Sequence, residues 1–142
     1  MRYAANWLFN EAVSYEDVRM DLTTEALRLG ISMARVRAEV ASVNIANVDV
    51  PGYRVQRADF AQATGLLRQA AEQPSMDSDR LEGMTVKSLG TTVHAANPDL
   101  NAPVNLDGEV AELQTADVDF QSLTTVMSRR FALMQLAMSG RD

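Results

Sequence analysis

The chain has 142 residues, 46% of them hydrophobic and 23% charged, which predicts one folded domain over residues 1–142 and excludes a large multidomain enzyme. Its formal net charge is −6 and its 13 basic residues are scattered, so no basic surface is expected for nucleic acid. Cysteine is absent, which excludes disulfides and cysteine-based metal sites. Aromatic residues make up only 6%, so apolar content carried by Ala, Leu and Val favours a mainly α fold.

The first 20 residues are expected to form a short helical or loosely ordered lead-in. Their apolar run, Tyr3 to Phe9, is interrupted by Asn6 and is too short for the apolar region of a secretory leader. The sequence also has no apolar run of membrane-spanning length. We therefore expect no cleaved signal peptide, and any export from the cytoplasm would use another route.

Residues 22–48 predict an amphipathic helix, because apolar side chains recur at alternating spacings of four and three residues. Asp21 is placed to cap its start. The helix should end near Asn47, since Pro51 disfavours the α region at the residue before it and Pro51-Gly52 is typical of a type II turn. The apolar seam of this helix comprises Leu22, Ala26, Leu29, Met33, Val36, Val40 and Val43.

Residues 49–105 are interpreted as a turn followed by a connector with weak patterning. Residues 62–72 favour a short helix, and residues 84–87 and 91–94 favour short strands. Few side chains in the connector can contribute to a core. We therefore expect this segment to become ordered only against neighbouring subunits.

Residues 106–139 predict a second amphipathic helix with the same spacing of apolar residues. Asn105 is a suitable cap for its start and Gly140 for its end. Acidic residues in its first turns, including Glu109, suit the positive end of the helix dipole. The apolar seam of this helix comprises Leu106, Val110, Leu113, Phe120, Met127, Phe131, Met134 and Met138.

The two seams are expected to pack against each other, which gives a coiled-coil-like hairpin of terminal helices joined by a loop and short-β connector. A hairpin buries one face of each helix, whereas several large apolar residues lie off the seams. These residues are Leu27, Ile31, Leu123, Leu133 and Leu136. Their number indicates that helices of other subunits cover them.

No residue pattern predicts catalysis, a cofactor or a metal. The single histidine, His94, lies in a loop-like stretch without a neighbouring acid pattern. The pairs Asp77/Asp79 and Asp117/Asp119 lack the glycine and glutamate offsets of a calcium loop, and the glycines form no nucleotide-binding motif. The chain is therefore expected to be neither an enzyme nor a binder of small-molecule substrates.

One segment carries a family resemblance. It consists of Asn44, Ile45, Ala46, Asn47, Val48, Asp49, Val50, Pro51, Gly52 and Tyr53. It resembles the signature of the bacterial flagellar rod and hook protein family, approximately N-[IL]-A-N-x-x-T-P-G-[YF], at seven of eight defined positions. Residues 104–113 are similar to the start of that family's C-terminal helix. Val50 stands where the family usually has Thr, which keeps a β-branched side chain before Pro51 but loses a hydroxyl.

The resemblance implies a structural subunit of the proximal rod, in which the terminal helices pair on assembly. Such subunits build a helical tube that crosses the periplasm and transmits torque, and they are exported by the flagellar type III apparatus without a cleaved signal. The implied partners are copies of the chain, other rod proteins, the rod-to-ring junction protein, the membrane-embedded ring and the export gate. The alternative is a soluble helical adaptor or export chaperone of the same secretion system, which the helical spacing alone accommodates equally well.

Overall fold

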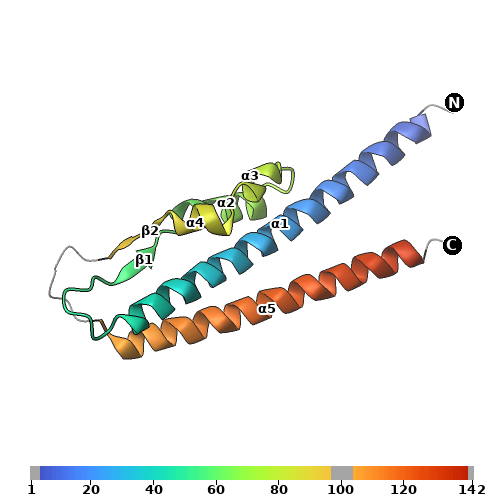
Figure 1. The fold of residues 1–142 in the computed structure, drawn as a ribbon. Helices are drawn as coiled ribbons and strands as arrows, with labels where there is room; N and C mark the ends of the chain where they lie inside the picture. Colours follow the sequence, from blue (N-terminus) through green and yellow to red (C-terminus); the bar gives the residue numbers. More distant parts are fainter. Residues whose placement is uncertain (1–3, 97–103, 141–142) are drawn as a thin grey trace.

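The computed structural model describes residues 4–96 and 104–140, with side chains for residues 22–96 and 104–140. It is mainly helical. Two long helices, α1 (Ala4–Ala46) and α5 (Leu106–Ser139), run side by side, and the segment between them folds onto the other side of α1 (Figure 1). The predicted fold class, paired terminal helices with a short-β connector, is confirmed.

The connector is a compact layer of short elements on α1. In chain order these are β1 (Gln56–Ala58), α2 (Ala61–Glu72), α3 (Asp79–Glu82), α4 (Val86–Gly90) and β2 (Val93–Ala95). The two strands pair antiparallel, with Arg57 opposite His94. The position of α2 confirms the helix predicted over residues 62–72. The strand predicted over residues 84–87 is wrong, because Thr85 and Ser88 form a capping box that starts α4.

The hydrophobic core lies between α1 and the connector. Its buried members are Leu22, Leu29, Val36 and Val40 of α1, and Ala63, Met76, Leu81 and Leu89 of the connector. Two expectations are thus wrong: the α1 seam packs on the connector instead of on the C-terminal helix, and the connector supplies half of these buried residues. The connector's contribution has no periodic signal, because its apolar side chains come from separate short elements.

A different face of α1, lined by small residues, packs against α5. A Cβ added to Gly30 would lie 3.1 Å from Leu123 Cδ1 of α5, so the two helices approach closely there. Ala34 and Ala41 lie on the same helical face as Gly30 and are almost fully buried, as is Ala116 of α5. The described part of α1 is therefore covered on two faces. One carries large apolar residues, and the other carries small residues at its closest contact with α5.

The helix α5 presents a different face to α1 from the one that its apolar spacing predicts. Leu113, Met127 and Met134 of the predicted seam are partly buried. The remaining five are more than one third exposed: Leu106, Val110, Phe120, Phe131 and Met138. The seam prediction for this helix is wrong in orientation, because spacing identifies an apolar face but not the part of it that contacts a partner.

Helix boundaries agree with the sequence at α5 and differ at α1. α5 spans Leu106–Ser139 as predicted, and the Asn105 side chain accepts a hydrogen bond from the Gly108 N–H. α1 begins at Ala4, so the prediction of a separate lead-in over residues 1–20 is wrong for the described residues 4–20. Asp21 lies inside this helix and cannot be its N-cap.

Candidate assembly site

The end of α1 is followed by the tight turn that the family-like motif predicts. The Tyr53 N–H donates to the Val50 carbonyl over 3.1 Å, which closes a four-residue turn around Pro51 and Gly52. Gly52 has φ +75°, the left-handed conformation that the third residue of a type II turn requires. The turn redirects the chain from α1 into β1.

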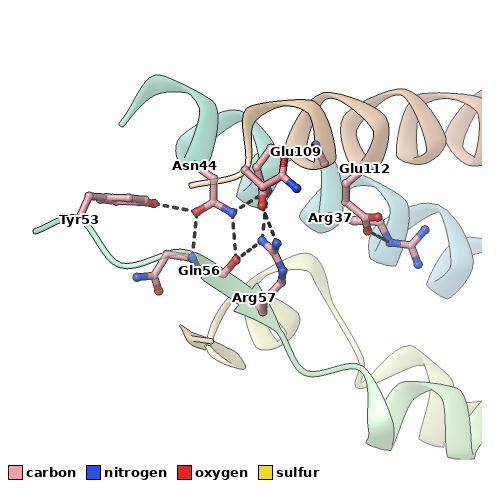
Figure 2. Close-up of polar contacts among 9 residues, drawn as sticks. Arg37, Asn44, Tyr53, Gln56, Arg57, Glu109 and Glu112 are labelled. Atoms are coloured by element: carbon pink, nitrogen blue, oxygen red, sulfur yellow. Dashed lines mark hydrogen bonds and ion pairs between the residues drawn. The ribbon is translucent and has the colours of Figure 1, made fainter. Parts of the chain in front are cut away.

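The side chain of Asn44 joins α1 to β1 and α5, and it is fully buried (Figure 2). Its Nδ2 donates to the Gln56 carbonyl (3.0 Å) and to Glu109 Oε2 (2.9 Å). Its Oδ1 accepts from the Gln56 N–H (2.8 Å) and from the Tyr53 hydroxyl (2.9 Å). The carboxamide thus pairs with both backbone groups of Gln56, as a neighbouring strand would, and all four of its hydrogen-bonding positions are used.

The second centre of this cluster is an ion pair between Glu109 of α5 and Arg57 of β1. Both guanidinium Nη atoms donate to the Glu109 carboxylate, one of them over 3.1 Å. The Glu109 side chain is 2% exposed, whereas that of Arg57 is 46% exposed. The paired charges and the Asn44 amide hold the start of α5 against α1 and the strand pair.

The pKa of Tyr53 lies above its ordinary value, chiefly because burial disfavours the phenolate. The nearby Glu109 carboxylate also raises it, and the Arg57 guanidinium partly offsets these effects. The neutral phenol therefore remains available to donate its hydrogen bond to Asn44.

Further polar contacts run along the α1–α5 interface. Arg37 of α1 bridges two acids of α5, with Nη1 2.8 Å from Asp119 Oδ2 and Nε 3.2 Å from Glu112 Oε1. Nearer the C-terminus, Arg130 Nε of α5 donates to Thr24 Oγ1 of α1 over 3.1 Å. Together with Glu109, these contacts attach α5 at three levels along its length.

A cavity of about 260 Å³ lies between α1, β1 and α5. It is lined by Arg37, Val40, Ala41, Arg57, Ala58, Phe60, Glu109 and Glu112. Its two arginines already pair with carboxylates that line the same space. This arrangement balances opposite charges at the junction of the three elements and provides no isolated charge for a ligand.

The residues predicted as an assembly seam separate into two groups. In α1, Leu22, Leu29, Val36 and Val40 are core residues, while Val43 is 44% exposed. In α5, much of the apolar surface faces outward. The exposed large apolar residues of α5 are Leu106, Val110, Val118, Phe120, Val126, Phe131, Leu133, Leu136 and Met138. The assembly role remains a prediction, and α5 is the described element that could carry most of it.

The motif residues themselves have different environments. Asn44 is buried, and Tyr53 contacts it directly. Asn47 donates from its side chain to the Val43 carbonyl over 2.8 Å, which satisfies a carbonyl at the end of α1. Ile45 is partly buried, and Ala46, like Pro51, is exposed. The motif therefore combines a helix end, a turn and a buried polar anchor.

Sequence reasoning missed Glu109, Gln56 and Arg57 as partners of the motif. In sequence, Glu109 suits the positive end of the helix dipole, and an acid in the first turn of a helix is too common to indicate a buried ion pair. Only the antiparallel return of α5, 65 residues along the chain from Asn44, brings its carboxylate to this point.

Other candidate residues form no reactive arrangement in the part of the chain that the structure describes. His94 is exposed on β2, with Nδ1 2.9 Å from the Thr92 carbonyl oxygen. Asp119 pairs with Arg37, and Asp77 accepts a hydrogen bond from the Asp79 N–H. Over residues 4–96 and 104–140, no group of three or more potential metal ligands is present, and no helix has the length and hydropathy needed to cross a membrane.

The chain is similar to a flagellar rod protein. It is 24% identical over 124 residues to the flagellar basal body rod protein FlgB of Bacillus subtilis (strain 168). The alignment covers 83% of this chain and 94% of that relative, so the likeness extends along nearly the whole of FlgB. No protein-family model matches the chain. The similarity to FlgB agrees with the family resemblance of residues 44–53.

Proposed function

We propose that this chain is a structural subunit of the proximal rod of the bacterial flagellar basal body. The observation that carries the proposal is the similarity to FlgB, which spans 83% of this chain and 94% of that protein. In this role the chain has no catalytic function. It assembles with copies of itself and with other rod proteins into a helical tube that transmits torque.

The geometry of α5 supports an assembling protein. Leu133, Leu136 and Met138 are 67%, 68% and 72% exposed near its C-terminus. Large apolar side chains gathered on one long helix are typical of a surface that another protein covers. A contact between different faces of successive subunits generates an open helical assembly when the rotation between subunits does not close into a ring.

The location and the other partners follow from the rod assignment. The subunit lies in the basal body, spans the periplasm as part of the tube and is exported without a cleaved signal. During export it passes the export gate. In the finished structure, its neighbours include the rod-to-ring junction protein and the membrane-embedded ring.

The alternative is a soluble helical adaptor or export chaperone, because an exposed helical face also suits a protein that escorts another helix. The two functions differ when the gene is deleted and complemented. A rod subunit predicts basal bodies that keep the membrane ring but lack rod and hook, as seen by electron microscopy, and a non-motile cell. A deletion strain that still builds complete rods would contradict the proposal and favour the adaptor.

A further inference from the structure

The helix α5 turns a stripe of mixed polarity toward α1 and leaves large apolar side chains exposed beside it. We define its inward stripe by four residues at intervals of seven: Glu109, Ala116, Leu123 and Arg130. Its apolar flank is defined by Val110, Phe131 and Met138, which are also separated by multiples of seven residues; the two intervening positions of that spacing hold Asp117 and Thr124. Glu109 and Ala116 are almost fully buried, whereas the residues of the flank are 38%, 51% and 72% exposed.

Apolar burial alone does not account for this orientation. With 3.6 residues per turn, consecutive residues lie about 100° apart around the helix axis, so a rotation of α5 by about that angle would turn the apolar flank toward α1. Such a rotation would remove Phe131 and Val110 from water, and burial of apolar surface is favourable and has no directional preference. The same rotation would also turn Asp117 toward α1, so the gain from apolar burial is opposed by the cost of burying a carboxylate. Directional interactions that the rotated helix would lose add to the preference for the observed orientation.

The polar contacts between α5 and its neighbours are directional in this sense. Rotation would withdraw Glu109 from Arg57 and Asn44, which surround a carboxylate that is 2% exposed. Breaking a buried charge pair is costly, because the remaining groups are left without partners. The bridge from Arg37 to Glu112 and Asp119 limits rotation in the same way one to three turns further along α5.

We propose that Glu109 and Arg37 are positioning residues that set the rotation of α5 on α1 and thereby keep the apolar flank on the outside. Glu109 acts at the start of α5 through Arg57 and Asn44, and Arg37 acts farther along through the two acids. In the rod, the flank is then presented to a neighbouring subunit; this consequence rests on the proposed function, whereas the orientation itself does not.

Cysteine cross-linking measures the rotation, because the chain contains no cysteine of its own. One pair, Gly30→Cys with Leu123→Cys, reports the observed orientation, since Gly30 faces Leu123 across the interface. A second pair, Gly30→Cys with Thr124→Cys, reports a rotated α5. This variant also carries Leu123→Ala, so that the leucine side chain facing Gly30 is absent from both double-cysteine variants. In the full chain, the first pair is expected to cross-link at least threefold faster than the second.

The positioning role is tested by adding Glu109→Leu to both pairs. The ratio of the two cross-linking rates is expected to fall at least threefold. Asp107→Asn is the matched control, because it removes a carboxylate from an exposed position of α5 outside the spacings of both the stripe and the flank, and it should leave the ratio unchanged. Glu109→Gln retains an oxygen that can accept from Arg57 and should restore most of the ratio.

A merely stabilising role for Glu109 would lower the melting temperature without changing the ratio, and that result would overturn the proposal. If circular dichroism shows that Glu109→Leu does not fold, Arg37→Leu replaces it with the same expected fall, and an unchanged ratio again contradicts the inference. These outcomes are independent of whether the chain enters a rod, so failure of the proposed function remains distinguishable.

Discussion

At the residue scale, Asn44 links the family-like motif to the rest of the molecule through four hydrogen bonds. An aspartate in its place would lose the two amide donors and bring a second carboxylate to Glu109. We expect Asn44→Asp to lower the free energy of unfolding by about 2–4 kcal/mol at neutral pH, because it leaves buried groups unpaired and places like charges together. Thermal or chemical denaturation measures this loss.

The matched control for this change lies three residues away. Asn47→Asp removes one donor to the Val43 carbonyl in an exposed hydrogen bond, so it should cost less than about 1 kcal/mol. Equal losses for the two variants would show that the buried cluster does not stabilise the fold as described.

Gly52 tests the turn. Its φ of +75° is strained for a residue with a side chain, so Gly52→Val should lower the free energy of unfolding by about 1–3 kcal/mol. Gly65→Ala is the control, because Gly65 lies within α2 and an added Cβ would meet no atom within 4 Å. It should raise the free energy of unfolding by about 0.5–1 kcal/mol. Tolerance of valine at position 52 in chemical denaturation would contradict the type II turn.

Tyr53 makes stability depend on pH in the alkaline range. Its pKa is raised in the folded chain, mainly by burial and then by Glu109, so the unfolded chain releases the phenolic proton first. The stabilisation is therefore complete below the unfolded pKa of about 10 and is lost as pH rises through the folded value. Denaturation midpoints of the parent and Tyr53→Phe should converge as pH rises; a constant difference would argue against this linkage.

At the element scale, α1 carries two interfaces, and the sequence indicated only one of them. The regular recurrence of Leu22, Leu29 and Val36 predicted a buried face correctly. The second face includes Gly30, Ala34 and Ala41. Ala34 and Ala41 continue a four-and-three spacing that starts at Leu27 and Ile31, but alanine is so common in helices that this spacing does not stand out beside the seam of larger residues. The element that covers the first face could not be predicted either, because spacing shows that a face is apolar but not which element packs on it.

In the connector, local features could be predicted from the sequence, but tertiary contacts could not. Its helix over residues 62–72 and its turn at Pro51-Gly52 follow from local chemistry, so both could be predicted. The core contributions of Met76, Leu81 and Leu89 could not, because each comes from a separate short segment and becomes buried only by tertiary packing on α1. The ion pair between Glu109 and Arg57 could not be predicted either, because it depends on how α5 packs against α1 and β1.

Val36 tests whether the α1–connector core stabilises the monomer. It is 2% exposed, so Val36→Asp buries an unpaired charge and should lower the free energy of unfolding by about 3–5 kcal/mol. Ser42→Asp adds the same side chain at an exposed position of α1 and should change stability by less than about 1 kcal/mol. Similar denaturation midpoints for both variants would place the core elsewhere.

At the scale of the whole molecule, the fold separates the stabilising core from the largest exposed apolar surface. The core joins α1 to the connector, whereas exposed apolar residues are concentrated on α5. Substitutions on the outer surface of α5 should therefore affect the assembled rod without unfolding the subunit. This separation follows because the buried core lies on the connector side of α1, whereas large apolar residues of α5 face outward.

Leu133, 67% exposed, tests this separation. Leu133→Asp should leave the denaturation midpoint of the purified chain within about 0.5 kcal/mol of the parent, because the residue is solvated before assembly. In cells it should abolish swimming in soft agar. Gln135→Asp, at an exposed position on the same helix, should preserve swimming. Normal motility of Leu133→Asp would exclude this surface from assembly.

The central claim is that the chain is part of the proximal rod, and mass spectrometry of purified basal bodies tests it most directly. Particles from the source bacterium are compared before and after the hook and distal rod are removed. The account predicts that peptides of this chain are present in both samples and remain with the membrane ring. Their absence from both, together with their presence in the cytoplasm alongside export substrates, would contradict the claim.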